Sequence, residues 1–328
     1  MAESLRVATF NLENFDDRRG VEPGLAARIA VLRPQLLRLS ADILCLQEVN
    51  GQPAERSRRM LAALDTLLAE TPYAGYHRVA TEGPHGPFDV HNLVILSRFP
   101  LSGSAQIRHR LITPPRYRPA TARPPRMRSA PVSWDRPILH AVVDPGGGRR
   151  LHVIAVHLRA PLAAIIAGQK EDAFTWTSVS GWAEGFYLAA IKRAGQALET
   201  RLLIDEIFDA EPRALIAVCG DFNAEARETP LRIIMGAEDD TGNGRLAERS
   251  LVALDDGVPP ERRYSVLHAG RREMLDHIIV SRPLLAWYRG AEVHNAGLED
   301  ELVDYAAAHD SPESHHAPVV ATFAAPED

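Results

Sequence analysis

Polar side chains stand at the ends of six short apolar runs of the sequence. In CGDFNAE at 219–225, a carboxylate and a carboxamide, Asp221 and Asn223, lie one residue apart after an apolar run and a glycine. The other five runs have comparable neighbours, namely Asn11 with Glu13, Gln47 with Glu48, His157, Asp276 with His277, and His315 with His316. If these ends converge in the fold, they form one pocket of carboxylate, amide and imidazole groups.

Such a pocket would suit a hard divalent cation and a phosphate ester. Carboxylate oxygens such as those of Glu48 and Asp221 are ligands for Mg²⁺ or Mn²⁺. The cation would polarise a phosphoryl oxygen, a carboxylate would take a proton from water, and a histidine would stabilise the charged oxygens. Each group alone has a structural explanation, since Asp-x-Asn after a strand is commonly a turn. Independent turns have no reason to share this chemistry six times, so a common site is favoured.

Strands and helices alternate along the whole chain. Short apolar runs, typical of buried strands, predict strands at 5–10, 42–47, 92–96, 138–143, 151–157, 214–219, 276–280 and 318–323. Helices are predicted at 25–39, which contains Pro34, at 54–70, at about 183–208, and after Thr229 as N-cap with Pro230 in the first turn. No Gly/Ser-rich linker interrupts the alternation. The sequence therefore predicts one α/β domain over residues 1–328, with two sheets packed as a sandwich between outer helices.

The composition is that of a folded protein with a large core. The chain has 328 residues, a hydrophobic fraction of 45% and a net charge of −6. Its two cysteines, Cys45 and Cys219, lie in apolar runs, which predicts buried reduced thiols rather than disulfides. The amino-terminal segment has no signal-peptide pattern, and no apolar run is long enough for a membrane span, so we expect a cytoplasmic protein. No feature of the sequence fixes an oligomeric state.

Residues 108–131 form a stretch rich in Arg and Pro between two predicted strands. From 90 to 134 there are eight arginines and no acidic residue. The prolines predict an irregular surface loop at 114–131. Arginines on a stiff loop would follow a phosphate backbone, with Tyr117 as a stacking face; the alternative is a solvated loop that contacts the protein's own acidic surface. A second stretch, 173–188, has five aromatic residues and predicts an aromatic lid or, as the favoured interpretation, helix packing onto the sheet.

Seven stretches of the sequence resemble motifs of the endonuclease/exonuclease/phosphatase superfamily, the metal-dependent phosphoesterases related to DNase I. They are TFNLENF (9–15), LCLQEV (44–49), HNLVILSRFPL (91–101), VHLRA (156–160), CGDFNAE (219–225), LDHIIV (275–280) and HHAPVVATF (315–323). They occur in the family's order and span nearly the whole chain, and their combination is specific. The resemblance implies a four-layer α/β sandwich of two mixed β-sheets flanked by helices, with the site at one end of the sheets.

The resemblance also implies a division of roles around a divalent cation, Mg²⁺ or Mn²⁺. Glu48 resembles the principal metal ligand, and Asn11 resembles the amide beside it. Glu13 stands where the family often has a further polar or acidic group. Asp221 resembles the residue that activates or orients the attacking water, and Asn223 resembles the amide that positions this water.

The remaining matches concern the scissile phosphate. His157 resembles a histidine that contacts this phosphate, and Asp276 resembles the carboxylate that orients the last histidine, His316. Arg136 resembles, more weakly, a strand-edge arginine near the phosphate site.

One position departs from the family's pattern. The closing motif usually reads Ser-Asp-His, whereas this chain has Ser314-His315-His316. The exchange removes a negative charge, which would weaken Mg²⁺ binding and favour a metal that tolerates nitrogen ligands, such as Mn²⁺ or Zn²⁺. Two alternatives are that Asp310 or Glu313 compensates for the missing carboxylate, and that His315 points away from the site.

These observations predict a metal-dependent phosphoesterase, with a phosphodiesterase of the nuclease type as first choice and in-line attack by activated water. The alternatives are a phosphomonoesterase, a phospholipid or inositol-phosphate hydrolase of the same fold, and a non-catalytic phosphate-binding protein, because His315 replaces the usual aspartate. The expected partner is a phosphate-ester substrate, with nucleic acid as the candidate polymer. The assigned roles are catalysis for His157, Asp221, Asn223, Asp276 and His316, phosphate binding for Asn11 and Arg136, and metal binding for Glu48, Glu13 and His315.

Overall fold

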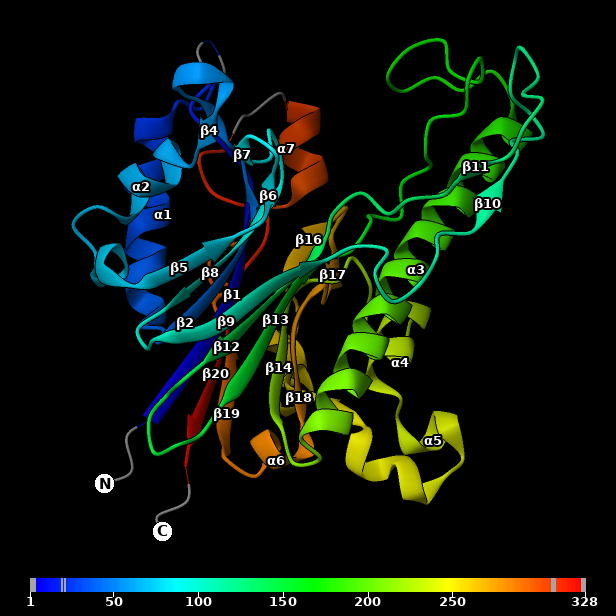
Figure 1. Cartoon of the computed structure of the whole chain (residues 1–328). Helices are drawn as coiled ribbons and strands as arrows, with labels where there is room; N and C mark the ends of the chain where they lie inside the picture. The colour runs from blue at the N-terminus through cyan, green and yellow to red at the C-terminus, as the bar shows by residue number, and fades with distance from the viewer. Residues whose placement is uncertain (1–3, 19, 21, 308–310, 326–328) are drawn as a thin grey trace.

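Two six-stranded mixed β-sheets face each other at the centre of the computed structural model, which describes residues 4–18, 20, 22–307 and 311–325 (Figure 1). The first sheet has the strand order β19 (Tyr288–Val293), β20 (Val319–Ala324), β1 (Ser4–Phe15), β2 (Ile43–Val49), β8 (Asn92–Ser97) and β5 (His77–Ala80). The second has the order β15 (Leu251–Ala253), β18 (Asp276–Ser281), β14 (Leu215–Asp221), β13 (Leu151–His157), β12 (Ile138–Val143) and β9 (Leu101–Ile107).

Helices and four short ribbons connect the strands of the two sheets. The α-helices are α1 (Leu25–Leu39), α2 (Ala62–Leu68), α3 (Val179–Ala210), α4 (Thr229–Met235), α5 (Glu238–Thr241), α6 (Arg282–Leu285) and α7 (Glu301–Ala307), and short 3₁₀ helices lie at Glu55–Ser57, Pro72–Gly75, Gly244–Arg249, Leu254–Gly257 and Pro260–Arg262. The ribbons pair β3 (Gln52–Pro53) with β4 (Arg59–Met60), β6 (Glu82–Gly83) with β7 (Gly86–Pro87), β10 (Arg116–Tyr117) with β11 (Ala130–Pro131), and β16 (Val266–His268) with β17 (Arg271–Glu273). No helix within these ranges has the length and apolar character needed to cross a lipid bilayer.

Apolar side chains fill the space between the two sheets and between each sheet and its helices. Cys45 and Cys219 are buried free thiols in the layer between the sheets. Helix α1 packs on the outer face of the first sheet through Leu32 and Leu36, one helical turn apart, and each buried leucine contributes about 1.5–3 kcal/mol. Helix α3 packs on the second sheet through residues such as Phe208. The order helix, sheet, sheet, helix confirms the predicted four-layer α/β sandwich.

A parallel pair of strands lies at the centre of each sheet, and the ends of these pairs position the polar groups. The crossover between β1 and β2 contains α1, and the crossover between β13 and β14 contains α3. The first sheet therefore carries Asn11 and Glu48 near the carboxyl ends of neighbouring strands. In the second sheet, His157 pairs with Asp221, and the antiparallel strand β18 places Asp276 opposite Asp221.

Local backbone features shift several predicted boundaries. Strand β1 continues to Phe15, beyond its predicted end. A bulge after Asn11 shifts its register with β2, and pairing resumes at Phe15; the alternation of side chains in the sequence does not reveal this bulge. Helix α1 has the predicted bounds, with Pro34 inside it. Thr229 is the first helical residue of α4, and Glu228 takes the N-cap position that we predicted for Thr229.

The predicted helix at 54–70 is wrong over its first half. Only Ala62–Leu68 is α-helical, and the segment before it forms a 3₁₀ turn at Glu55–Ser57 between the strands of the β3–β4 ribbon. Arg56 and Ser57 have positive φ angles, which an α-helix does not accept. The apolar periodicity of the second half extended the predicted helix too far.

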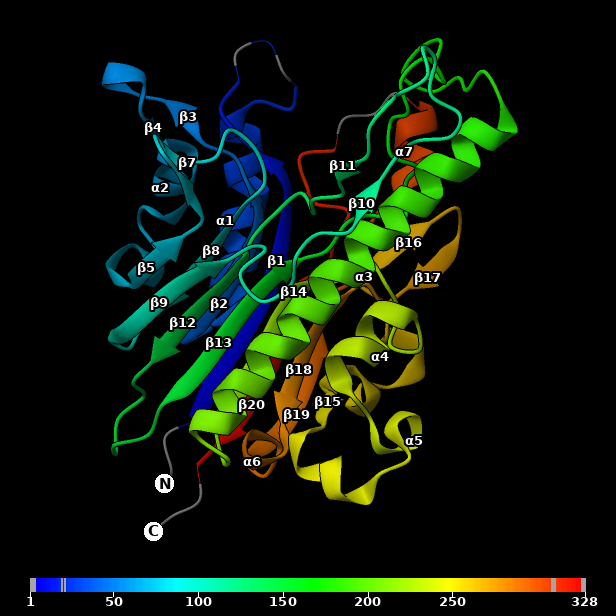
Figure 2. The same cartoon turned by 45° about the vertical axis from the view of Figure 1, so that its right-hand side comes forward.

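An arm projects from the sandwich at the end where the polar groups lie. It contains the amino-terminal half of α3 and the β10–β11 ribbon, as two views agree (Figure 1, Figure 2). The expectation that 114–131 has no regular structure is wrong for the short strands β10 and β11. Phe174, Trp182, Phe186 and Tyr187 are exposed on the arm, so the expectation that they pack on the sheet is wrong for these residues.

Candidate active site

Asp221 lies at the centre of the candidate site, fully buried at the end of β14. Its Oδ2 accepts hydrogen bonds from Asn11 Nδ2 at 3.0 Å and Asn223 Nδ2 at 3.0 Å, and its Oδ1 accepts from the Asn223 backbone N–H at 2.8 Å. Burial, together with the nearby Asp276 carboxylate, raises the pKa of Asp221 to about 7 despite these donors. A carboxylate with such a pKa can take up and release a proton near neutral pH.

Glu48 approaches Asp221 from the facing sheet. His157 Nε2 lies 3.6 Å from Glu48 Oε1 and 3.3 Å from Asp221 Oδ2, so the imidazole bridges the two carboxylates. Asn11 Nδ2 donates to Glu48 Oε1 at 3.4 Å as well as to Asp221. Burial, with Arg136 and the other nearby histidines, holds the pKa of His157 well below its usual range, so this ring is neutral and has one N–H to donate.

His316 completes the site from the segment before β20. Its Nδ1 lies 2.8 Å from Asp276 Oδ2, and its backbone N–H donates to Ser314 Oγ, which in turn donates to the Asn11 carbonyl. Burial acts against a charged ring, but the Asp276 carboxylate outweighs it and raises the pKa of His316 well above the usual range. The ring is therefore an imidazolium whose Nε2 side is available for an anionic oxygen.

The glycine before Asp221 is required by the approach of β13. Gly220 has φ +151°, and a β-carbon there would overlap the Val156 carbonyl oxygen of the neighbouring strand. The close approach of the backbones sets Asp221 against His157 at the ends of β14 and β13. Asn223, with φ +49°, then turns back, and its Nδ2 donates to the Leu158 carbonyl at 3.1 Å and to Asp221.

The Arg136 guanidinium enters the site beside His91, a residue that our sequence prediction omitted. Arg136 Nη2 donates to His91 Nδ1, so His91 Nε2 carries the ring proton and donates to Asn14 Oδ1 at 2.7 Å. The Asn14 backbone N–H donates to Glu48 Oε2 at 2.9 Å, which fixes the orientation of this carboxylate. His91 precedes an apolar strand as His316 does, so the pattern used for the other residues applies to it also.

Backbone strain is concentrated at this site. Positive φ angles occur at Glu13, Asn14, Glu48, His91 and Asn223. Each costs of order 1–3 kcal/mol and persists only where the surroundings fix it. The clustering indicates that side-chain placement at the site takes precedence over local backbone stability.

The comparison with protein families agrees with this arrangement. A model of the Endonuclease/Exonuclease/phosphatase family matches residues 8–297. The chain belongs to this family. Membership of the Endonuclease/Exonuclease/phosphatase family supports hydrolysis of phosphate esters as the class of reaction.

Solved structures share the fold of the chain over nearly its whole length. An Endonuclease/Exonuclease/phosphatase family protein from Bacteroides thetaiotaomicron matches with a TM-score of 0.59 and 15% identity, covering 98% of this chain and 95% of that chain. Truncated Caenorhabditis elegans TDP2 matches with a TM-score of 0.54 and 16% identity, covering 98% of both. D. rerio TDP2 complexed with single strand DNA product has a TM-score of 0.54 and 16% identity, with 98% and 99% covered. A comparison with curated proteins gives no match.

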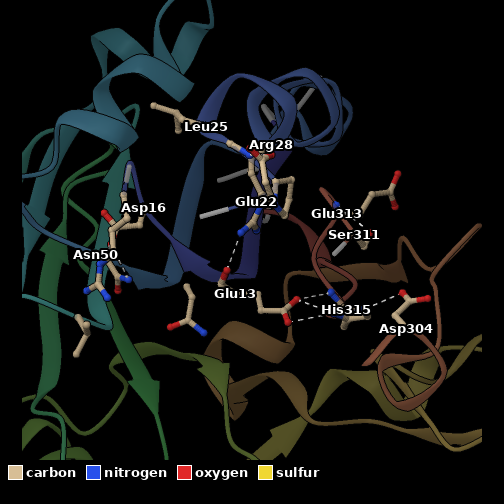
Figure 3. A pocket seen from close by; sticks show the side chains of 15 residues that line it. Glu13, Asp16, Glu22, Leu25, Arg28, Asn50, Asp304, Ser311, Glu313 and His315 are labelled. Carbon is tan, nitrogen blue, oxygen red and sulfur yellow. Dashed lines mark hydrogen bonds and ion pairs between the residues drawn. The ribbon is translucent and has the colours of Figure 1, made fainter. Parts of the chain in front are cut away.

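The site departs from the family's usual closing motif at His315, which forms an ion-paired cluster of its own. His315 Nδ1 lies 2.9 Å from Glu13 Oε2, and His315 Nε2 lies 3.0 Å from Asp304 Oδ2 (Figure 3). The hydrogen bond to Glu13, with help from Asp304, raises the pKa of His315 to about 9. Glu13 and Asp304 are thus carboxylates that contact His315. Glu313 lines the cavity beside this cluster, and Asp310 lies outside the described residues.

The Glu13–His315 pair faces a neighbouring cavity of about 280 Å³ (Figure 3). Arg28 closes one side of it and donates to the carbonyls of Leu12 and Glu13 at 2.6 and 2.9 Å. An imidazolium with both nitrogens hydrogen-bonded has no lone pair for a metal. The metal roles assigned to Glu13 and His315 stay predictions.

The residues around Asp221 fit a divalent cation. Ligand atoms of Glu48, His157 and Asp221 lie within 4.8 Å of one another, and the same holds for Asp221, Asp276 and His316. Among the described residues, the buried atoms His157 Nδ1 and Asp276 Oδ1 have no hydrogen-bond partner. Carboxylate oxygens are the ligands that Mg²⁺ and Mn²⁺ prefer. A cation would offset the negative charge of the three neighbouring carboxylates, Glu48, Asp221 and Asp276.

Proposed function

We propose that the protein is a divalent-metal-dependent phosphodiesterase that cleaves nucleic acid by in-line attack of water on phosphorus. The observation that carries the proposal is the position of Asp221, which belongs to both groups of side chains whose ligand atoms lie close enough together to hold a metal ion, and which has its pKa raised to about 7. A pure binding protein has no need of a buried base beside a protonated and a neutral histidine.

Glu48 and the Asp221 side of the site would hold Mg²⁺ or Mn²⁺. Such an ion supplies charge neutralisation at the phosphoryl oxygens and lowers the energy of the leaving oxygen. Asn11 contributes an amide between the two carboxylates, where it adds a donor without adding negative charge. Arg28 and Asn14 hold the surrounding backbone and the Glu48 carboxylate in place.

Asp221 is the proposed base. It takes one proton from the attacking water as the new P–O bond forms and the bond to the leaving oxygen breaks. Asn223 holds Asp221 through its backbone N–H and its side chain, so the carboxylate keeps a fixed direction. A fixed direction matters because in-line attack requires the water, the phosphorus and the leaving oxygen to be aligned.

Three side chains stabilise the charge on the phosphoryl group. His316 is held as an imidazolium by Asp276, and its second nitrogen can donate to an equatorial oxygen. The neutral His157 can donate one N–H, and the Arg136 guanidinium lies close enough to Glu48 and Asp221 for their charges to act on it. Donors that are already oriented in a buried site stabilise a transition state more than mobile water does.

Nucleic acid is the first choice of substrate because the arm beside the site is rich in arginine. D. rerio TDP2, which shares the fold at 16% identity, is described as complexed with single strand DNA product. The non-catalytic alternative depends on His315, and His315 contacts Glu13 and Asp304 rather than the residues around Asp221. The observations therefore favour catalysis.

The test is hydrolysis of bis-p-nitrophenyl phosphate by protein stripped with EDTA and then given Mg²⁺ or Mn²⁺. We expect no turnover without metal and recovery on its addition. Glu48→Gln should raise the metal concentration for half-maximal rate by at least about tenfold. Glu70→Gln removes the same charge from a carboxyl group that is 84% exposed, and should change nothing. Turnover in EDTA, or none with either metal, contradicts the proposal.

A further inference from the structure

A groove of about 490 Å³ runs along the inner side of the arm. Its walls come from the loop that contains the β10–β11 ribbon, from residues 164–167 and from helix α3. Three cationic side chains, Arg108, Arg126 and Lys192, line it together with Tyr117. Asp135 is the acidic residue in this lining, and both Lys192 at 2.6 Å and Arg159 at 3.3 Å already neutralise it. The groove is therefore cationic.

Further arginines of the same loop have free guanidinium groups. Arg118, Arg123, Arg126 and Arg128 are exposed, and none of them has an ion-pair partner within the described ranges. Arg110 alone in this loop pairs with an acidic residue there, Glu206, at 2.6 Å. The alternative that the loop lies on the protein's own acidic surface therefore does not account for these charges.

Two glutamates of α3 hold the loop in a fixed shape. Glu199 accepts hydrogen bonds from the backbone N–H groups of residues 109–111 and from Trp134 Nε1. Glu184 accepts from the Tyr117 hydroxyl and from the backbone of residues 120 and 121. The two glutamates are about 22 Å apart along the helix, at a rise of 1.5 Å per residue. A groove that is rigid over this length loses little entropy when a ligand binds.

The groove and the candidate active site are neighbours along the chain. Asp135 lines the groove, and the next residue, Arg136, enters the site beside His91. Gln196 of α3 donates to the Arg136 carbonyl, and Lys192, one turn earlier, lines the groove. A polymer bound with one phosphodiester at the site therefore has this groove as its neighbouring cationic surface.

The chemistry of the arm favours a polyanionic chain over a membrane surface. The arginines are spaced over residues 108–128 of the loop rather than consecutive, which suits contacts to successive phosphates of a backbone. Phe174 is 93% exposed, but the Asp172 carboxylate accepts a hydrogen bond from its backbone N–H and Glu171 is close in sequence. These exposed carboxylates oppose insertion of Phe174 into a lipid surface, and most of all an anionic one.

We propose that this groove holds the single strand of DNA or RNA that continues from the scissile phosphate. The arginines bind successive phosphates, and Tyr117 stacks on a base. The inference rests on the proposed function for the identity of the chain at the site. Binding of a strand in the groove needs no turnover, however, so the groove proposal and the proposed function can fail separately.

The test compares two triple variants of the full-length protein. Arg118, Arg126 and Arg128 are changed to Gln in the first. The control changes Arg213, Arg245 and Arg282 to Gln, which are also exposed and lie away from the arm, in the segments after α3 and before β15 and in α6. Binding of fluorescent oligo(dT) and oligo(U) is measured by anisotropy in EDTA over a range of salt concentrations. Turnover of bis-p-nitrophenyl phosphate with metal is measured in parallel.

The arm variant should bind both oligonucleotides at least tenfold more weakly. Its plot of log affinity against log salt concentration should be shallower by about 0.7 for each phosphate that the arm no longer neutralises. Tyr117→Leu should weaken binding by about tenfold, whereas Tyr117→Phe keeps the ring, loses only one of the hydrogen bonds to Glu184 and should weaken binding less than threefold. Hydrolysis of the small substrate should stay within twofold of the wild type in all of these variants.

Equal loss of oligonucleotide binding in the control variant, or no loss in the arm variant, overturns the proposal. Binding of the wild type to anionic phospholipid vesicles but not to either oligonucleotide also overturns it. Arm-dependent oligonucleotide binding without hydrolysis of any phosphodiester leaves the groove assignment standing and removes the proposed function.

Discussion

The Nδ1 atom of His316 lies 2.8 Å from Asp276 Oδ2, although His316 precedes a strand of the first sheet and Asp276 begins a strand of the second. The hydrogen bond connects the two facing sheets at the candidate site. It also determines the charge of the ring, because the carboxylate outweighs the effect of burial and raises the pKa of His316 well above its usual range.

Replacing Asp276 with Asn should change both the rate and its pH dependence. Without the carboxylate, burial should lower the pKa of His316 to or below the ordinary value of about 6.5. We expect kcat for bis-p-nitrophenyl phosphate to fall by about 100-fold, with the remaining activity declining as the pH rises above about 6. The wild type should show no such decline. A pH profile of kcat from 5.5 to 9 measures both, with a thermal melt to check folding; identical profiles contradict the assignment.

The raised pKa of Asp221 predicts an acid limb in the activity of the wild type. Because burial and Asp276 raise this pKa to about 7, the base form accumulates only as the pH rises through 7. At subsaturating metal, kcat/KM should therefore rise about tenfold per unit below pH 7 and level off above it. Saturating metal should move the limb to lower pH, since a cation favours the carboxylate. Asp221→Asn should lower kcat by at least about 100-fold; a flat profile in the wild type removes Asp221 from the role of base.

Gly220→Ala tests the close approach of β13 and β14. A β-carbon at this position would overlap the Val156 carbonyl, so we expect a loss of at least about 2 kcal/mol in the free energy of unfolding. Gly103→Ala on β9 is the matched control, because nothing lies within 4 Å of the added carbon. Urea titrations of both variants measure the difference. Equal stability of the two variants contradicts the geometry described for the end of β14.

A buried ion pair beneath the site predicts how stability depends on pH. His277 Nδ1 lies 3.0 Å from Asp255 Oδ1, and both residues are buried. The hydrogen bond outweighs burial for each group, so the pKa of His277 is raised from 6.5 and that of Asp255 is lowered from 3.8. The contribution of His277 to the free energy of unfolding is complete below pH 6.5 and is lost as the pH rises through its folded-state pKa. The contribution of Asp255 to the free energy of unfolding is complete above pH 3.8 and is lost as the pH falls through the folded-state pKa of Asp255.

Asp255→Asn should therefore lower the free energy of unfolding most between about pH 4 and 6.5, where both residues contribute to it. We expect a loss of about 3 kcal/mol at pH 6, because one partner of a buried pair is left uncompensated, and a smaller loss at pH 9. Asp256→Asn, at an exposed neighbouring residue, serves as the control. Urea unfolding at the two pH values gives the comparison, and a loss that grows toward pH 9 has the wrong sign for this pair.

The sequence is informative where a strand is buried on both faces. The bounds of β13, which is buried throughout, agree with prediction because a largely apolar run ends sharply at the polar residue His157. The polar residue at such an end is also the signal for the candidate site. The same signal is present at His91 but does not single it out, because its contact with Arg136 is made only in the folded protein.

The remaining features depend on contacts that no local pattern contains. The bulge after Asn11 follows from the left-handed conformation of Glu13 and Asn14, which neighbouring residue types do not dictate. Asp304 contacts His315, and tertiary structure alone brings the two together. The exposed aromatic residues of the arm have the apolar pattern of a packed helix. Sequence alone does not distinguish a buried apolar face from an exposed apolar face that binds a ligand.

Strand β1 pairs with β20, so the first and last strands of the described chain are neighbours in the same sheet. Asn11 and His316 consequently enter the site from positions 305 residues apart in the sequence. During translation, Asn11 leaves the ribosome long before its partner exists, and no competent centre can assemble until synthesis has passed residue 316. A hydrolase built in this way releases no active fragment when translation stops early.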